Sequence, residues 1–153
     1  MINSVLEKLV LTRPGQQRQG DSPEDCLISR RYGVLVVDDE GCVRSLLSLW
    51  LRSHGFAVWL AASGQEALDL YRQHRDAIHV VLLDVRMPGM DGPQTLAALR
   101  KLNPQVRSCF MSGCLGQYTE EGLRKLEAAA ILHKPFHPAE AAQVLWQLAS
   151  TAD

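Results

Sequence analysis

VLVVDDE, residues 34 to 40, and VVLLDVRMPG, residues 80 to 89, are the two stretches from which the fold class of this chain follows. In each, a short run of valine and leucine ends in aspartate, which is typical of a buried parallel strand that carries polar groups at its carboxyl end. Including these two, five such runs are predicted to be strands: Tyr32 to Val37, Phe56 to Leu60, Ile78 to Leu83, Val106 to Met111, and the short Ala130 to Leu132.

Amphipathic helical stretches separate these runs. The first, Cys42 to His54, ends at Gly55, a residue suited to a helix C-terminus, and its apolar residues share one face: Val43, Leu46, Leu47, Trp50 and Leu51. Ser63 and Glu66 form a candidate capping box for a helix that ends near Arg75. The remaining helices are expected from Pro93 to Asn103, from about Tyr118 to Glu127, and from Pro138 to Ala149. Alternation of this kind predicts an α/β fold, a (βα)5 doubly wound parallel sheet of five strands.

Composition and charge exclude several classes of protein. The 153 residues are enough for about one domain, and 46% of them are hydrophobic, so a packed core is expected. A formal charge of -1 excludes nucleic-acid binding driven by bulk charge, and no nucleic-acid or membrane partner is expected. No apolar stretch is long enough to span a bilayer, and Glu7 and Lys8 interrupt any signal peptide, which favours a cytoplasmic location.

Cysteine and histidine spacing does not indicate a zinc site. The four cysteines, at 26, 42, 109 and 114, include no C-x-x-C pair and are expected to be free thiols. His133 and His137 are four residues apart, but Pro135 between them breaks the helix that would place both rings on one face.

The first 31 residues are expected to form an N-terminal extension and linker, and residues 32 to 150 the folded domain. Arg13 to Glu24 contains no aliphatic or aromatic residue, as in a linker. Before it, apolar residues have the spacing of a short amphipathic helix: Ile2, Val5, Leu6, Leu9 and Val10. That helix could dock on another surface, or it could fray in isolation, because so short a helix is marginal in water.

Chemically useful side chains follow the predicted strands. Asp38 and Asp39 end the first run, Asp84 ends the third, and Ser112 ends the fourth, within FMSG. Lys134 follows the fifth run, within HKPF. Because the carboxyl ends of parallel strands share one edge of the sheet, these groups should converge there. Three carboxylates at close range oppose folding unless cations offset them, and Mg²⁺ and Lys134 are the two candidates.

The order Asp-Asp, Asp-x-x-Met-Pro-Gly, Ser-Gly and Lys-Pro-Phe resembles the receiver domain of two-component response regulators, a flavodoxin-like fold, over about residues 32 to 150. The resemblance implies that Asp84 is the nucleophile that takes a phosphoryl group from a phosphohistidine on a sensor histidine kinase or a histidine phosphotransfer protein. It implies a Mg²⁺ ion bound directly by Asp39, Asp84 and the backbone carbonyl of Arg86. Asp38 would bind the ion mainly through a coordinated water.

The same resemblance implies that Lys134 pairs with one phosphoryl oxygen and that Ser112 donates a hydrogen bond to another. The domain would signal through protein contacts, with at most self-phosphorylation and self-dephosphorylation as activity. Receivers often pair through their last helix, whose predicted inner face here is Ala141, Val144, Leu145 and Leu148, with Ala142 and Trp146 on another side. An exposed tryptophan suggests a contact surface, so a homodimer is a further expectation.

Three positions at or beside the site differ from the family pattern or need explanation. Receivers commonly have Tyr or Phe three residues before the lysine, where this chain has Ile131, so the usual coupling of an inward-turning ring to the hydroxyl residue is in doubt. Arg86 and Cys114 stand two residues after Asp84 and Ser112, where family behaviour suggests an effect on phosphoryl lifetime. Arg86 could stack over the phosphoryl group or remain solvated.

Two other interpretations remain open at this point. A haloacid-dehalogenase-type phosphatase also uses an aspartyl phosphate, Mg²⁺ and a lysine, but the first run here ends Asp38-Asp39-Glu40-Gly41 and lacks the D-x-D-x-T motif. A phosphate-independent pseudo-receiver scaffold is supported by Ile131 and opposed by the intact acidic set. The sequence also leaves open whether signalling uses this domain's own contacts or an output domain in a longer chain.

Overall fold

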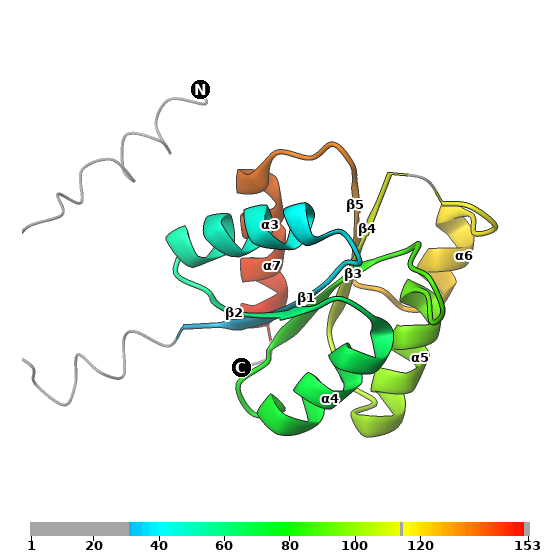
Figure 1. Ribbon diagram of the computed structural model, residues 1–153, viewed down its shortest axis with the longest axis horizontal. Helices are drawn as coiled ribbons and strands as arrows, with labels where there is room; N and C mark the ends of the chain where they lie inside the picture. The colour runs from blue at the N-terminus through cyan, green and yellow to red at the C-terminus, as the bar shows by residue number, and fades with distance from the viewer. Residues whose placement is uncertain (1–30, 114, 152–153) are drawn as a thin grey trace, which may run out of the picture. The chain divides into compact units, whose positions relative to one another are not determined.

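A computed structural model describes residues 31–113 and 115–151 of the chain. Its elements alternate strictly between strand and helix, as the hydrophobic pattern predicts (Figure 1). The strands are β1 Gly33–Val37, β2 Ala57–Ala61, β3 Val80–Asp84, β4 Ser108–Ser112 and β5 Ala130–His133. The helices are α3 Gly41–Ser53, α4 Gly64–His74, α5 Gly92–Leu102, α6 Glu120–Lys125 and α7 Pro138–Ser150. The predictions for residues 1–30 and for Cys114 lie outside the described residues.

The five strands form one parallel sheet in the order β2-β1-β3-β4-β5, which confirms the predicted doubly wound topology. The order changes direction at β1, because the chain goes first to β2 on one side and then to β3 on the other. In sheets of this kind ligands bind at that switch point, outside the carboxyl ends of the central strands. The topology therefore places the ends of β1 and β3 side by side at the predicted site.

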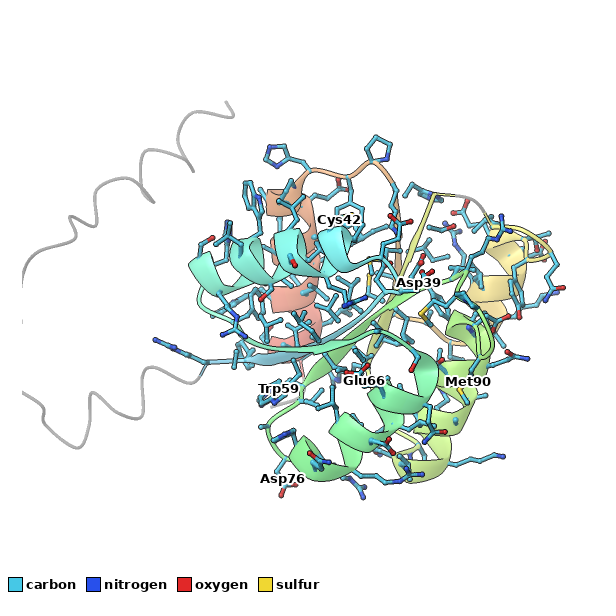
Figure 2. All side chains as sticks on the ribbon, viewed as in Figure 1. Asp39, Cys42, Trp59, Glu66, Asp76 and Met90 are labelled. Carbon is cyan, nitrogen blue, oxygen red and sulfur yellow. The ribbon has the colours of Figure 1, made fainter. Side chains whose placement is uncertain are left out.

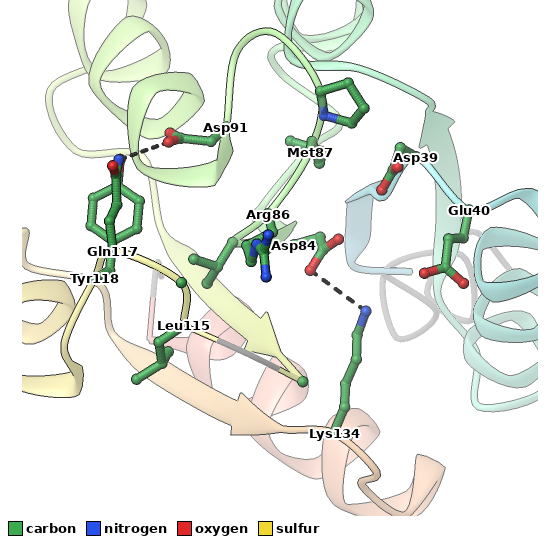
Figure 3. Close-up of a pocket in the computed structure, with 14 residues that line it drawn as sticks. Asp39, Glu40, Asp84, Arg86, Met87, Asp91, Leu115, Gln117, Tyr118 and Lys134 are labelled. Carbon is green, nitrogen blue, oxygen red and sulfur yellow. Dashed lines mark hydrogen bonds and ion pairs between the residues drawn. The ribbon is translucent and has the colours of Figure 1, made fainter.

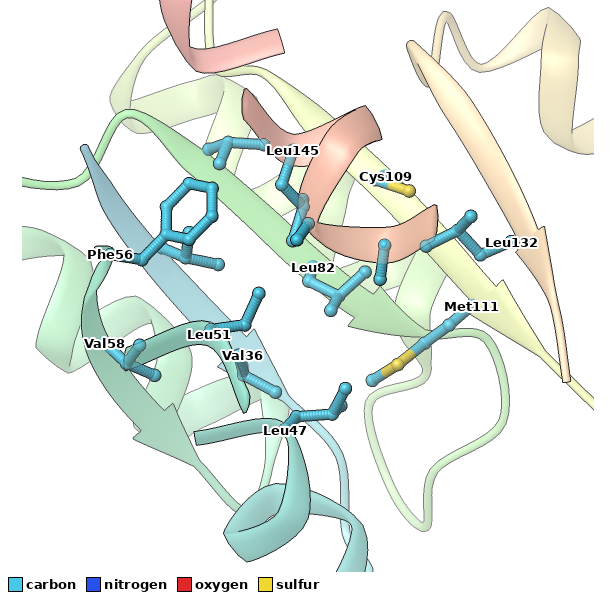
Figure 4. Close-up of a cluster of buried hydrophobic side chains, with 14 of the residues drawn as sticks. Val36, Leu47, Leu51, Phe56, Val58, Leu82, Cys109, Met111, Leu132 and Leu145 are labelled. Carbon is cyan, nitrogen blue, oxygen red and sulfur yellow. The ribbon is translucent and has the colours of Figure 1, made fainter. Parts of the chain in front are cut away.

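Two hydrophobic clusters cover the two faces of the sheet. On one face α3 and α7 pack through Leu47, Leu51 and Leu145 against Val36 and Leu82, around a cluster that also contains Phe56 and Met111 (Figure 4). On the other face, α4, α5 and α6 cover a second cluster, to which they contribute Ala67, Leu68, Tyr71, Leu96, Leu99 and Leu123. The alternate sides of β1 and β3 thus face separate halves of the core, which explains why both strands are apolar throughout.

Local signals explain where several helices begin and end. Ser63 caps α4 by accepting from the Glu66 amide at 3.2 Å, as predicted, but the Glu66 carboxylate accepts from the Ala62 amide rather than from the cap residue itself. The complete capping box is at α5, where Asp91 and Gln94 satisfy each other's backbone amides. α6 is shorter than predicted because Thr119 caps it, leaving Tyr118 in the preceding loop.

Two predicted orientations are wrong. Leu46 is 57% exposed, because residues 43, 47 and 51 of α3 face the sheet and position 46 lies to one side of that stripe, with exposed Leu49. Ala142 is buried, because α7 packs against α3 as well as against the sheet and its buried face is broader than one stripe. Trp146 is 46% exposed, in agreement with the sequence, and its ring packs in T-shaped pairs with Tyr32 and Phe56.

Two of the four cysteines lie in the described part of the chain, and both are free: Cys42 is exposed and Cys109 is buried. Within that part no helix has the length and apolar character needed to cross a bilayer. Figure 2 shows Asp39 at the carboxyl ends of the strands and Asp76 far from it, in the turn that follows α4.

Candidate phosphoryl site

Asp38 is held rigidly where β1 ends. Its backbone N–H donates to the Ala61 carbonyl at the end of β2, at 3.1 Å. One carboxylate oxygen accepts from the Glu40 amide at 2.9 Å, and the Asp38 carbonyl accepts from Arg44 Nη1 at 2.7 Å. The side chain is fully buried, so these bonds fix the direction in which the second carboxylate oxygen points.

Asp84 is the last residue of β3 and lies between β1 and β4. The chain returns close to it at the start of α5, where a Cβ on Gly92 would come within 2.3 Å of the Asp84 carbonyl oxygen. Only glycine fits there, and the Gly92 amide donates to the Val85 carbonyl at 3.0 Å. The local sequence Asp91-Gly92-Pro93 therefore holds both α5 and the Asp84 backbone in place.

The three aspartates come together as the sequence predicts. Oxygen atoms from Asp38, Asp39 and Asp84 all lie within 4.8 Å of one another. In the described part of the chain this is the only group of three or more acidic, histidine or cysteine side chains with such spacing. Asp39 is exposed, whereas Asp38 and Asp84 are buried, so the cluster opens to solvent at one side.

Lys134 reaches this cluster from the end of β5. Its ammonium lies 3.1 Å from Asp38 Oδ2 and 3.5 Å from Asp84 Oδ1, and the second of these contacts is drawn in Figure 3. Its backbone N–H donates to the Ser112 carbonyl at 2.8 Å, which ties the ends of β4 and β5 together. One amine thus contacts two of the three carboxylates, and the cluster keeps an excess of negative charge.

Burial and this excess of negative charge together shift the pKa of Asp84. Burial, and then the neighbouring charge of Asp38, raise the pKa of Asp84 to about 6, although Lys134 acts in the opposite direction. Burial lowers the pKa of Lys134, but its hydrogen bond to Asp38 and the charges of Asp84 and Asp38 outweigh this and raise it. Asp84 is therefore a carboxylate of increased basicity beside a permanently charged amine.

Ser112 ends β4 next to the β3 strand end, and its hydroxyl is buried without a hydrogen-bond partner among the described residues. A buried polar group without a partner is unusual and costs free energy. The hydroxyl is therefore an unsatisfied donor at the end of β4, although Ser112 is not among the residues that line the cavity described below. Ile131, at the position where receivers commonly have an aromatic residue, is half-buried beside Phe110 of β4 and packs in the second core cluster.

A cavity of about 710 Å³ opens over the cluster (Figure 3). Asp39, Asp84, Arg86 and Lys134 line it, as the sequence predicts for a common site. Other lining residues were not predicted from the sequence: Glu40 lies on the side of Asp39 and Lys134, and the opposite side is formed by Asp91, Leu115, Gln117 and Tyr118 (Figure 3). The position of Asp91 could have been predicted, because the pattern Asp91-x-x-Gln94 is typical of a capping box at a helix N-terminus, and this helix follows the end of β3.

Comparisons with known proteins agree with this geometry. The family model described as "Response regulator receiver domain" matches residues 34–145. The chain is 42% identical over 107 residues to a protein named sensor kinase CckA from Brucella abortus, covering 67% of this chain but only 11% of that protein. It is 33% identical over 105 residues to sporulation initiation phosphotransferase F from Bacillus subtilis, covering 67% of this chain and 82% of that protein.

Among solved structures, a CheX-CheY-BeF3-Mg complex from Borrelia burgdorferi superimposes with a TM-score of 0.70 at 28% identity. The match covers 76% of this chain and 88% of the matched chain. The matched structure therefore shares the fold, and the family match spans the strands whose ends carry the acidic cluster.

Proposed function

Because this chain belongs to the response regulator receiver family of two-component signalling, we propose that Asp84 is the residue that accepts the phosphoryl group. An Asp84 carboxylate oxygen attacks the phosphorus of a phosphohistidine, and the P–N bond breaks with its electron pair remaining on the imidazole. The products are an aspartyl phosphate on this chain and a free histidine on the donor. The donor is a sensor histidine kinase or a histidine phosphotransfer protein.

This proposal rests on the charged groups and the cavity that surround Asp84. Its carboxylate ends β3 beside two further carboxylates and one ammonium, at the floor of an open cavity. Its raised pKa increases the nucleophilicity of the carboxylate while leaving it mostly ionised near pH 7. Neither Asp38 nor Asp39 offers this combination, because Asp38 is fully enclosed and already bound to Glu40 and Lys134, and Asp39 is exposed.

The residues present fit a Mg²⁺ ion. The donor set is made of hard carboxylate oxygens within 4.8 Å of one another, and one side of the cluster is open to the waters that Mg²⁺ retains. We assign Asp39, Asp84 and the Arg86 carbonyl as direct ligands, and Asp38 as a residue acting mainly through water. When bound, the ion neutralises charge on the phosphoryl oxygens during transfer. The CheX-CheY complex from Borrelia burgdorferi contains Mg²⁺ and BeF3.

Lys134 and Ser112 complete the proposed site. Lys134 already faces the Asp84 carboxylate, so its ammonium can pair with a phosphoryl oxygen once Asp84 is modified. The Ser112 hydroxyl has no partner among the described residues and can donate to another phosphoryl oxygen. Positioning and electrostatics of this kind supply most of the acceleration in phosphoryl transfer. Self-phosphorylation from small phosphodonors and self-dephosphorylation are the activities we expect.

Ile131 leads to a hypothesis about the output. An aliphatic side chain has no ring to turn inward when Ser112 is drawn to the phosphoryl group. We therefore expect the phosphorylation-dependent change at the face of α6, β5 and α7 to be small, or to use other residues. Amide exchange with and without beryllofluoride tests this, and a large change centred on Ile131 would contradict it.

Location and assembly stay predictions. A cytoplasmic location fits a partner that is an intracellular kinase. A homodimer through α7 would use the exposed part of Trp146, although part of that ring already contacts Tyr32 and Phe56. Sedimentation at high concentration with beryllofluoride and Mg²⁺ distinguishes a dimer from a monomer.

Because the chain covers only 11% of the matched sensor kinase, the activity of that whole protein is not transferred to this chain.

The direct test of the metal and nucleophile assignments is labelling by phosphoramidate across a Mg²⁺ titration. Asp84→Asn should give no stable label, and Asp39→Asn should need roughly tenfold more Mg²⁺ than the unmodified chain, because it removes a ligand oxygen. Asp76→Asn is the control, since Asp76 is exposed and far from the site. Equal Mg²⁺ midpoints for Asp39→Asn and the unmodified chain would refute the metal assignment. Label on Asp84→Asn at the normal level would refute the nucleophile assignment, and an unmodified chain that takes no label would favour the phosphate-independent pseudo-receiver.

A further inference from the structure

The loop between β4 and α6 is tied to the start of α5 by one hydrogen bond across the cavity. The Tyr118 hydroxyl donates to Asp91 Oδ2 at 2.6 Å, and both residues line the cavity (Figure 3). Asp91 is already fixed, because its other oxygen accepts from the Gln94 amide as the N-cap of α5. The hydrogen bond to Asp91 raises the pKa of the Tyr118 phenol, so it stays a neutral donor across the physiological range.

The same loop also contacts Arg86, through Gly116, which lies two residues before Tyr118. Gly116 has a positive φ of 62°, and a Cβ added to it would come within 3.2 Å of Arg86 Cδ and 3.3 Å of Arg86 Nε. The Gly116 backbone therefore lies directly against the Arg86 side chain. Arg86 in turn follows Asp84 by two residues and lines the same cavity. Asp91, Tyr118, Gly116 and Arg86 thus form a continuous chain of contacts from the N-cap of α5 to the mouth of the phosphoryl site.

We propose that Tyr118 is a positioning residue that holds the loop against Arg86 and so sets the lifetime of the phosphoryl group. This inference rests on the proposed function of Asp84. With the Tyr118 hydrogen bond in place, the Arg86 side chain is confined at the cavity mouth, where it limits the approach of water to the aspartyl phosphate. Without that bond the loop moves away more readily, Arg86 gains rotameric freedom, and water attacks phosphorus more often, releasing inorganic phosphate and restoring the Asp84 carboxylate.

Tyr118→Phe removes only the hydroxyl and keeps the ring. We expect the half-life of the phosphorylated chain to fall roughly threefold to tenfold, as for the loss of one partly exposed hydrogen bond to a carboxylate. Labelling by phosphoramidate should proceed at the normal rate or faster, because the small donor enters through the same opening. Tyr71→Phe is the matched control: the Tyr71 hydroxyl also makes one side-chain hydrogen bond, from Asn103 at 2.9 Å, but it does not line this cavity. Phosphorylated Tyr71→Phe should have the same half-life as the phosphorylated unmodified chain.

Arg86→Ala distinguishes positioning from simple loss of stability. This variant keeps the Arg86 carbonyl proposed to bind Mg²⁺ and should itself shorten the half-life. If Tyr118 acts through Arg86, adding Tyr118→Phe to Arg86→Ala should produce no further shortening. Urea unfolding of each variant measures the accompanying change in stability.

Three results would overturn the proposal. They are an unchanged half-life in Tyr118→Phe, an equal shortening in Tyr71→Phe, and a full additional effect of Tyr118→Phe in the Arg86→Ala background. Failure of the proposed function gives a different result, which the labelling step shows before any half-life is measured. In that case the unmodified chain would take no label, or Asp84→Asn would take as much label as the unmodified chain. The lifetime proposal would then fail as well.

Discussion

Asp84→Asn should make the metal-free protein more stable, although it removes the residue on which the proposed function depends. In the folded protein the Asp84 carboxylate is buried beside Asp38, and its ionisation is opposed by both burial and like charge. Asparagine has nearly the same shape and no charge, so it relieves that opposition. Lys134 keeps a partner in the variant, because it also contacts Asp38 at 3.1 Å.

The magnitude follows from the pKa. Raising the pKa of Asp84 from 3.8 to about 6 means that ionising this group costs more in the folded than in the unfolded chain. At about 1.4 kcal/mol per pKa unit, the cost at neutral pH is about 2 to 3 kcal/mol. We therefore expect the free energy of unfolding of Asp84→Asn to exceed that of the unmodified chain by about this amount in EDTA at pH 7.5.

The difference should depend on pH with a defined sign. Between pH 3.8 and about 6 the folded chain binds more protons at Asp84 than the unfolded chain does, so this group lowers stability as the pH rises. Below that window Asp84 is protonated in both states and the variant has no advantage. The stability difference between variant and unmodified chain should therefore be small at about pH 4 and grow to its full size above about pH 7.

Urea denaturation in EDTA at several pH values measures this difference. Asp76→Asn, an exposed position in the turn after α4, is the control and should change stability by less than about 0.5 kcal/mol. The reasoning is refuted if Asp84→Asn is less stable than the unmodified chain at pH 7.5 without metal, or if its advantage is the same at pH 4 as at pH 7.5.

Three further predictions test the neighbouring groups. Mg²⁺ should stabilise the unmodified chain against urea and should stabilise Asp84→Asn much less, because the variant lacks a ligand carboxylate; equal stabilisation would exclude Asp84 as a ligand. Lys134→Met should lower the free energy of unfolding by about 1 to 3 kcal/mol and slow labelling, because Asp38 remains buried with its charge unpaired; unchanged urea midpoints would contradict this. Ser112→Ala should leave stability unchanged or raise it by up to about 1 kcal/mol, because its hydroxyl has no partner among the described residues, yet should reduce phosphoryl labelling; a loss of stability would show that the hydroxyl is bonded in the free protein.

Continuous apolar runs predicted the strands of the sheet well, because the central strands are buried on both faces. Continuous apolar runs such as residues 34–37 and 80–83 cannot be placed elsewhere in a small domain, and their acidic ends then fall at one edge. Asp38, Asp39, Asp84 and Lys134 meet there because parallel strands bring their carboxyl ends together, a consequence of topology and not of local sequence.

Features that depend on packing between elements were not predictable from periodicity. Leu46 is exposed and Ala142 is buried because helix orientation is determined by the neighbouring helix as well as by the apolar stripe. The sequence predicts a helix that starts at about Tyr118, but the Thr119 cap and the hydrogen bond to Asp91 hold Tyr118 in the loop before it. A contact between residues 27 positions apart has no signature in either local segment.

The central claim, that this pocket exists to place one phosphoryl group on Asp84, is tested most directly by intact-mass measurement after incubation with acetyl phosphate and Mg²⁺, followed by peptide mapping. The account predicts a single added phosphoryl group on the unmodified chain, located in the peptide that contains Asp84, and no addition to Asp84→Asn. A phosphoryl group mapped to another residue, or found equally on Asp84→Asn, would contradict it.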